Sequence, residues 1–137
     1  MAALLHMSFR VRDPERSAAL YTELLGGSLV DPGPVLRPAG VKSIAFGQGK
    51  RGALADMMEF WPRDKHWHHG GFAASDPHHH EPFGHVAFST DKSYEELAAI
   101  AQKHGVTIRQ EERGLATLVP VVYDYDGNFL EFFPDQT

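Results

Sequence analysis

Met58-Glu59-Phe60-Trp61-Pro62 and Leu130-Glu131-Phe132-Phe133-Pro134 are the two stretches of this sequence that decide its fold. Both run through an apolar residue, Glu, Phe, an aromatic residue and Pro, so the later stretch repeats the earlier one. Neighbouring side chains of a strand point to opposite faces of the sheet, which places each Glu opposite its apolar neighbours. The match predicts that the chain consists of two copies of one unit, each with a glutamate on its last strand.

The beginnings of the two halves match as well. His6-Met7-Ser8-Phe9-Arg10-Val11-Arg12-Asp13 is answered by His85-Val86-Ala87-Phe88-Ser89-Thr90-Asp91, and each run shows the apolar alternation of a strand. Each run ends in an Asp that we expect to cap a helix, and Pro14 follows the first Asp at the favoured first helical position. Each half therefore begins with a His on its first strand.

A helix with one apolar stripe is predicted after each of these strands. The stripes have i, i+3, i+4, i+7 spacing, and they consist of Ser17, Leu20, Tyr21 and Leu24 in the first half and Tyr94, Leu97, Ala98 and Ala101 in the second. We expect the first helix to end at Gly26-Gly27 and the second at Gly105, since glycine is common just after helix C-termini.

Three strands are predicted after each helix. The first is a short strand, at residues 28–31 in the first half and 106–109 in the second. One hairpin follows in each half, from residues 43–48 with 53–61 and from residues 118–125 with 128–133. Asp126-Gly127 is a strong turn signal for the second hairpin, whereas Pro120 is unusual inside a strand. Each half is thus predicted to be β-α-β-β-β, and the fold class is α+β.

We expect a single domain, residues 1–137, with module 1 at about 1–62, a linker at about 63–84 and module 2 at about 85–137. The linker is rich in His, Gly and Pro and shows no periodicity, which indicates a long loop. It holds most of the histidines of the chain, namely His66, His68, His69, His78, His79 and His80. A solvated loop is the first interpretation of this cluster, and a lid, a second metal site and a pH-sensitive loop are the alternatives.

The placement of His and Glu in both halves predicts a metal site. A carboxylate that faces a dry interior without a partner costs on the order of several kcal/mol, and one divalent cation would relieve both Glu59 and Glu131. His6 and His85 would converge with them if the two halves pair as the duplication suggests. Mixed nitrogen and oxygen ligation suits Zn, Ni, Co, Mn or Fe better than Ca.

Each of these residues, taken alone, has a simpler interpretation. A His at a strand start is more often a surface or hydrogen-bonded residue, and a Glu in a strand is more often exposed or paired with Arg. Asp56 also competes with Glu59, because it too stands between apolar neighbours. Asp56 lies three residues away and is expected to face the other way, so the repeat favours Glu59.

The composition excludes several classes of protein. The absence of cysteine excludes disulfide scaffolds, thiolate nucleophiles and zinc fingers. The net charge of −5 argues against a nucleic-acid partner. No apolar run approaches the roughly 20 residues that span a bilayer, so we expect no membrane partner. The apolar start, residues 1–5, lacks a basic region, so we expect no signal peptide and a cytoplasmic protein.

On these motifs the sequence resembles the vicinal-oxygen-chelate superfamily, which includes glyoxalase I, methylmalonyl-CoA epimerase, fosfomycin-resistance and bleomycin-resistance proteins and extradiol dioxygenases. The resemblance covers nearly the whole chain and is strongest in His6-Met7-Ser8-Phe9-Arg10-Val11, Leu24-Leu25-Gly26-Gly27, Gly84-His85-Val86-Ala87-Phe88 and Tyr125-Asp126-Gly127-Asn128-Phe129-Leu130-Glu131. It implies two paired βαβββ modules that form an open, incomplete eight-stranded barrel, and it implies a homodimer. It also implies that one metal ion is held by His6, Glu59, His85 and Glu131.

A full set of two His and two Glu is most similar to glyoxalase I. The resemblance implies a metal-dependent lyase or isomerase that transfers a proton next to the carbonyl of a small chelating substrate, with Glu131 or Glu59 as the base. The first alternative is an Fe(II) extradiol-type dioxygenase that uses His6, His85 and Glu131. The second is a non-catalytic ligand-binding protein of the bleomycin-resistance type, with a pocket lined by Phe60, Trp61, Trp67, Phe72 and Phe83.

Two features separate the sequence from the best-known glyoxalases. The linker between the modules is longer, and no glutathione-binding pattern of arginines is recognisable. Arg10, Arg12 and Arg37 are the candidates for contact with an anionic substrate.

Overall fold

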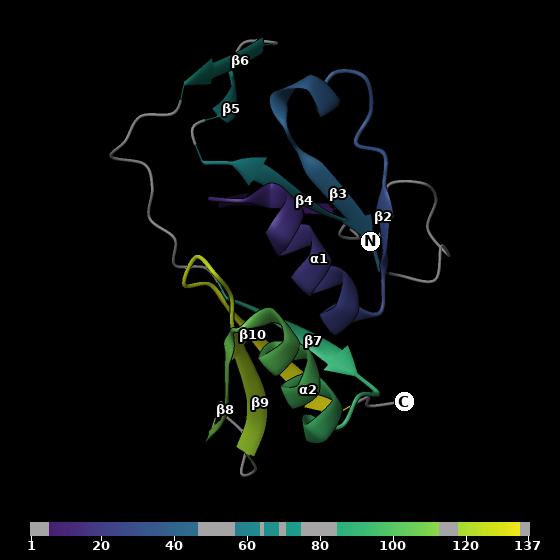
Figure 1. The fold of residues 1–137 in the computed structure, drawn as a ribbon, viewed down its shortest axis with the longest axis vertical. Helices are drawn as coiled ribbons and strands as arrows, with labels where there is room; N and C mark the ends of the chain where they lie inside the picture. Colours follow the sequence, from purple (N-terminus) through teal and green to yellow (C-terminus); the bar gives the residue numbers. More distant parts are fainter. Residues whose placement is uncertain are drawn as a thin grey trace, which may run out of the picture. The chain divides into compact units, whose positions relative to one another are not determined.

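The computed structural model describes residues 6–46, 57–63, 65–68, 71–74, 85–112 and 118–134 of the chain. The chain divides into two compact units, Met1–Glu81 and Pro82–Thr137. Each unit contains one α-helix and one four-stranded mixed sheet, as Figure 1 shows. The α+β fold class and the predicted repeat are therefore confirmed.

Unit 1 consists of β1 (His6–Val11), α1 (Pro14–Leu25), β2 (Ser28–Val30), the short 3-10 helix η1 (Arg37–Ala39), β3 (Lys42–Ala45) and β4 (Met57–Pro62), followed by a separate hairpin. The strands of its four-stranded sheet lie in the order β1-β4-β3-β2. The first and last strands of this β-α-β-β-β unit are thus neighbours, and they run parallel. This pairing brings the strand that begins with His6 beside the strand that carries Glu59.

Unit 2 repeats the arrangement with β7 (His85–Thr90), α2 (Tyr94–His104), β8 (Thr107–Glu112), β9 (Leu118–Tyr123) and β10 (Phe129–Pro134). Its strand order is β7-β10-β9-β8, and β7 runs parallel to β10. Pro120 lies in β9 beyond the last residue pair that β9 forms with β10, so its missing N–H removes no bond from that ladder. Of the described residues, none belongs to a helix long and apolar enough to cross a membrane.

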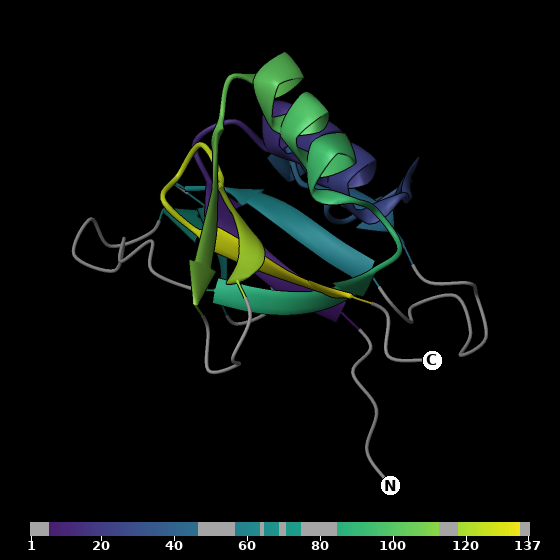
Figure 2. The same ribbon diagram turned by 90° about the horizontal axis from the view of Figure 1, so that it is seen from below.

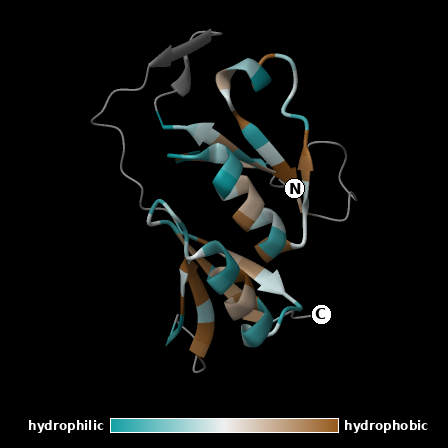
Figure 3. Ribbon diagram, in the orientation of Figure 1, coloured by the Kyte–Doolittle hydropathy of each residue, from teal (hydrophilic) through white to brown (hydrophobic). Residues whose placement is uncertain are grey.

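Each helix packs on one face of its own sheet through the predicted apolar stripe. In unit 1, the Tyr21 ring of α1 contacts the Phe60 ring of β4 edge-on, with the ring centroids 4.8 Å apart. Phe60 and its neighbour Met58 are fully buried on this face. In unit 2, Leu97 of α2 and Leu130 of β10 are buried in the same way. Figure 2 shows α1 and α2 beside their strands, and in Figure 3 both helices alternate between hydrophilic and hydrophobic residues.

The ends of the helices follow the sequence prediction with one exception. Asp13 caps α1 by accepting a hydrogen bond from the Arg16 N–H at 3.1 Å, and Gly26 and Gly105 end the two helices in the left-handed conformation. The prediction that Asp91 caps α2 is wrong, because Ser93 is the cap. Ser93 accepts a hydrogen bond from the Glu96 N–H, and the Glu96 carboxylate accepts one from the Ser93 N–H. This reciprocal capping box satisfies two groups at once, which a single Asp does not.

The segment between the two β-α-β-β-β units differs from the predicted structureless linker. It contains two antiparallel strands, β5 (Lys65–His68) and β6 (Gly71–Ala74), with Trp67 opposite Phe72 in the register. Each strand has only four residues: His66 and His68 flank Trp67 in β5, and β6 is Gly-Phe-Ala-Ala. So short an alternation is a weak sequence signal.

The turn between β9 and β10 is a dense hydrogen-bonded loop that sets where β10 begins. The Asp124 carboxylate accepts hydrogen bonds from the backbone N–H groups of Asp126 and Asn128, both at 2.9 Å, and from the Asn128 side-chain amide at 3.0 Å. Gly127 has φ of 87°, a conformation that favours glycine. The predicted Asp126-Gly127 turn is therefore confirmed, and it fixes the register of Glu131.

Replacement of Ser93 by Ala should lower the free energy of unfolding by about 1 kcal/mol, because the N-terminal amides of α2 lose a side-chain acceptor. The measurement is urea unfolding followed by far-ultraviolet circular dichroism. Asp91→Ala is the matched control and should change the free energy by less than about 0.5 kcal/mol. An Asp91→Ala effect as large as that of Ser93→Ala would contradict the assignment of the cap.

Candidate metal centre

In unit 1, the parallel register of β1 and β4 places His6 and Glu59 on the sheet face opposite α1. Ser8 pairs with Glu59 in this register, and His6 precedes Ser8 by two residues on the same face. The His6 Nε2 atom lies 3.8 Å from the Glu59 Oε1 atom. The His6 side chain is 44% exposed whereas the Glu59 side chain is 15% exposed, so the carboxylate lies deeper than the imidazole. The predicted opposite orientation of Glu59 and its buried neighbours is confirmed.

The second oxygen of Glu59 accepts two hydrogen bonds that were not predicted from the sequence. The Ser8 hydroxyl donates to Glu59 Oε2 at 3.1 Å, and the Trp61 indole N–H donates to the same atom at 2.9 Å. Both donors lie two residues from a predicted ligand on the same strand, and this spacing is the sequence signal that identifies them. Because Oε2 is engaged in this way, Oε1 is the oxygen directed toward His6.

In unit 2, His85 and Glu131 form the corresponding pair. The His85 Nε2 atom lies 3.7 Å from Glu131 Oε1, and the Glu131 side chain is only 10% exposed. The Phe129 ring stacks on the His85 imidazole, with centroids 4.7 Å apart and planes inclined by 6°. Phe129 is the register partner of His85, so this stacking follows directly from the pairing of β7 with β10.

The donor atoms of each pair fit a divalent metal ion. Separations of 3.7 and 3.8 Å exceed hydrogen-bond distance. Two ligand atoms with metal bonds of about 2.1 Å at a tetrahedral angle lie roughly 3.4 Å apart, so small side-chain rotations bring either pair into ligation. Among the described residues, no three His, Asp or Glu side chains gather in one place. Each unit supplies two predicted ligands, and the convergence of all four on one cation stays a prediction.

The structure places the other candidate residues as follows. Arg10 pairs with Trp61 in the β1–β4 register and so lies on the same face as His6 and Glu59. Arg12 is exposed just after β1. Asp56 lies outside the described residues.

Five aromatic residues were predicted to line the pocket of the ligand-binding alternative, and the structure describes the side chains of Phe60 and Trp61 among them. Phe60 belongs to the core of unit 1, on the face opposite Trp61. For Trp67 and Phe72, as for His66 and His68, the structure describes the backbone of β5 and β6. The remaining candidates lie outside the described residues, namely His69, His78, His79, His80 and Phe83.

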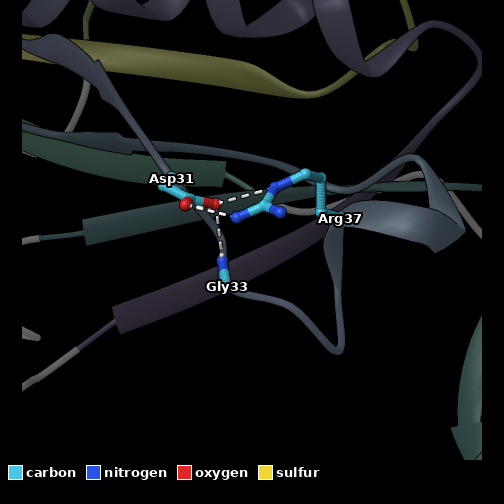
Figure 4. A network of polar contacts seen from close by, with 3 residues as sticks. All are labelled: Asp31, Gly33 and Arg37. Carbon is cyan, nitrogen blue, oxygen red and sulfur yellow. Dashed lines mark hydrogen bonds and ion pairs between the residues drawn. The ribbon is translucent and has the colours of Figure 1, made fainter.

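Arg37 forms an ion pair with Asp31 in an exposed loop of unit 1, as Figure 4 shows. The Arg37 Nε–H donates to Asp31 Oδ1 at 3.2 Å, and the Gly33 backbone N–H donates to the same atom at 2.9 Å. The hydrogen bonds from Arg37 and then from Gly33 hold the pKa of Asp31 below its ordinary value. This engagement makes Arg37 a weaker candidate than Arg10 for contact with an anionic substrate.

Comparison with known proteins gives consistent matches over nearly the whole chain. The pattern of the family described as Glyoxalase/Bleomycin resistance protein/Dioxygenase superfamily matches residues 3–132. The chain is similar to a lactoylglutathione lyase of Escherichia coli O157:H7, with 30% identity over 138 residues that cover 97% of this chain and 93% of the relative.

Solved structures share the fold. The fosfomycin resistance protein FosX from Mesorhizobium loti has a TM-score of 0.63 at 19% identity and covers 99% of this chain and 94% of its own. The trypanothione-dependent glyoxalase I of Leishmania major has a TM-score of 0.61 at 24% identity, with 98% and 87% covered.

Replacement of Arg37 by Gln should destabilise the protein at neutral pH, and the difference from the wild type should vanish in acid. Asp31 has a lowered pKa in the folded state, so its stabilising effect is present above the ordinary value of about 3.9 and is lost as the pH falls through the lowered value. Urea unfolding at several pH values between 7 and 2 measures this. The exposed Lys42, replaced by Gln, controls for loss of one positive charge. A pH-independent difference would contradict the role of Asp31.

Proposed function

The chain belongs to the Glyoxalase/Bleomycin resistance protein/Dioxygenase superfamily, and on that premise we propose that it is a metal-dependent lyase or isomerase of the glyoxalase type. It transfers a proton next to a carbonyl of a small substrate that chelates the metal. The observation that carries the proposal is the repeated pair of a partly exposed His and a largely buried Glu on the face of each sheet opposite its helix.

One divalent cation is proposed to bind His6, Glu59, His85 and Glu131. Two imidazoles with two carboxylates form a mixed nitrogen and oxygen donor set, which suits Zn, Ni, Co, Mn or Fe. A divalent cation would stabilise carboxylates that are this far removed from solvent, since the Glu59 and Glu131 side chains are only 15% and 10% exposed. We also propose that the protein acts as a homodimer, as the resemblance implies.

The chemistry requires a base beside a polarised carbonyl. A bound cation supplies Lewis acidity, which polarises the substrate carbonyl and acidifies the adjacent C–H. Glu131, or Glu59 in its place, accepts the proton from that carbon and returns it to the neighbouring carbon, so no proton is gained or lost overall. Arg10, on the same face as His6 and Glu59, is placed to contact an anionic group of the substrate.

The substrate class follows from this chemistry. The relative named lactoylglutathione lyase suggests adducts of α-oxoaldehydes with a thiol, and CoA esters are the second class with an acidic C–H next to a carbonyl. Because no glutathione-binding pattern of arginines is recognisable in the sequence, the glutathione adduct is one of several substrates to be tested and not the assumed one.

The wild-type protein, purified without an affinity tag, should carry about one equivalent of Zn, Ni, Co or Mn per chain. A variant with both His6→Ala and His85→Ala should lose it, as measured by mass spectrometry of the elements. A variant with His78, His79 and His80 replaced by Ala controls for metal held by the linker histidines and should keep the equivalent. Iron in the wild type would favour the dioxygenase, and metal retained by the double variant would refute the site.

Glu131→Gln should lower kcat by about 10²- to 10⁴-fold, because the amide cannot accept the proton. The assay uses thiol adducts of α-oxoaldehydes and CoA esters, and circular dichroism checks the fold. Glu112→Gln, on the exposed end of β8, is the matched control and should leave kcat unchanged. Full activity in Glu131→Gln would remove this residue from the reaction.

A further inference from the structure

The two oxygens of Glu59 have separate partners. Oε2 accepts hydrogen bonds from Ser8 at 3.1 Å and from Trp61 at 2.9 Å, while Oε1 lies 3.8 Å from His6 Nε2. Rotation of the carboxylate about its last bond would have to break both hydrogen bonds before the equivalent oxygen could take the place of Oε2. Hydrogen bonds to an ionised acceptor are also stronger than neutral ones. The carboxylate of Glu59 is therefore held in one orientation.

The matching positions of unit 2 hold residues that cannot do this. Ala87 pairs with Glu131 in the β7–β10 register, where Ser8 pairs with Glu59 in unit 1. Phe133 follows Glu131 by two residues, as Trp61 follows Glu59. Neither Ala nor Phe has a side-chain hydrogen-bond donor. The two hydrogen bonds that Ser8 and Trp61 donate to Glu59 therefore have no counterpart at the equivalent positions of unit 2.

We propose that Ser8 and Trp61 are positioning residues that fix Glu59 as a permanent ligand of the cation through Oε1 alone. The inference rests on the proposed function and deepens it, because it assigns a different role to each of the two glutamates. A carboxylate that acts as the base has to shift its position to take and return a proton in every cycle. A carboxylate held by two hydrogen-bond donors stays in place and suits a permanent ligand. Proton transfer then belongs to Glu131, and Glu59 serves to retain the metal.

The two donors restrain the Glu59 carboxylate from two different strands. The Ser8 hydroxyl comes from the neighbouring strand and the Trp61 indole from β4 itself, so they approach Oε2 from different residues of the sheet. Residues that hydrogen-bond to a metal ligand without touching the metal orient that ligand for binding. Their loss commonly weakens metal binding by about 10- to 100-fold. Loss of one donor still leaves the other to restrain the carboxylate, so the double variant should have the larger effect.

The test measures Mn²⁺ affinity from the loss of the free-ion electron paramagnetic resonance signal. Mn²⁺ binds imidazoles weakly among these metals, which limits uptake by the linker histidines. Ser8→Ala and Trp61→Phe each remove a donor, and Trp61→Phe keeps an aromatic ring. The double variant should bind Mn²⁺ about 10- to 100-fold more weakly than the wild type.

Ser89→Ala and Phe133→Leu are the matched controls, because both residues face the equivalent side of the unit 2 sheet and pair with each other. They should leave Mn²⁺ affinity unchanged. Thermal unfolding of each metal-free variant separates loss of metal from loss of fold. A second comparison assigns the glutamates: Glu59→Gln should lose Mn²⁺ together with activity, whereas Glu131→Gln should lose kcat by a much larger factor than it loses Mn²⁺ affinity.

The outcomes separate the two proposals. If the wild type binds Mn²⁺ and the folded double variant binds it equally well, the positioning role is wrong while the metal site stands. If Ser89→Ala and Phe133→Leu weaken binding as much as the unit 1 variants, the assigned asymmetry is wrong. If the wild type binds no Mn²⁺ and carries no other metal, the proposed function falls and the positioning role falls with it.

Discussion

The alternation of side chains along β4 and β10 is the constraint on which the candidate site depends. Met58 and Phe60 must face α1, because they complete the core of unit 1 with Tyr21. Glu59 lies between them in the strand, so its side chain must point to the other face of the sheet. A slip of one residue would bury the carboxylate against the helix and expose the Phe60 ring, so packing on one face enforces the orientation of the ligand on the other. The same logic holds for Glu131 between Leu130 and Phe132.

The parallel pairing of the first and last strands then supplies the histidine. His6 and Glu59 lie far apart in the sequence, yet β1 and β4, the first and last strands of the β-α-β-β-β unit, are neighbours in the sheet. The crossover through α1 is what permits a parallel pair, since parallel strands cannot be joined by a tight turn. The position of the His and Glu pair therefore depends on the same helix crossover that forms the core. Unit 2 has the same arrangement with His85 and Glu131.

Within this shared frame the two units differ in the residues around each pair. Ser8 and Trp61 hold the carboxylate of unit 1, whereas in unit 2 the Phe129 ring stacks on the imidazole. The position equivalent to Phe129 in unit 1 is Met57, the register partner of His6. The side chains that contact the His and Glu pair therefore differ between the two units. Two copies of one β-α-β-β-β arrangement can in this way surround the same His and Glu pair with different side chains.

The sequence by itself determined the β-α-β-β-β pattern of each unit and the choice of His6, Glu59, His85 and Glu131 as candidate ligands, because apolar periodicity, helix-ending glycines and an internal repeat can be read without the fold. The strand pairing that puts His6 beside Glu59 and His85 beside Glu131 came from the structure. The tertiary structure decided what depends on contact between distant residues. The hydrogen bond from Ser8 to Glu59 spans 51 residues and exists only in one strand register. The choice of Ser93 over Asp91 as helix cap depended on the backbone at the start of α2, and the ion pair of Arg37 with Asp31 depended on the fold of the loop between them. In each case several side chains were chemically able to form the bond, and only their positions in space selected one.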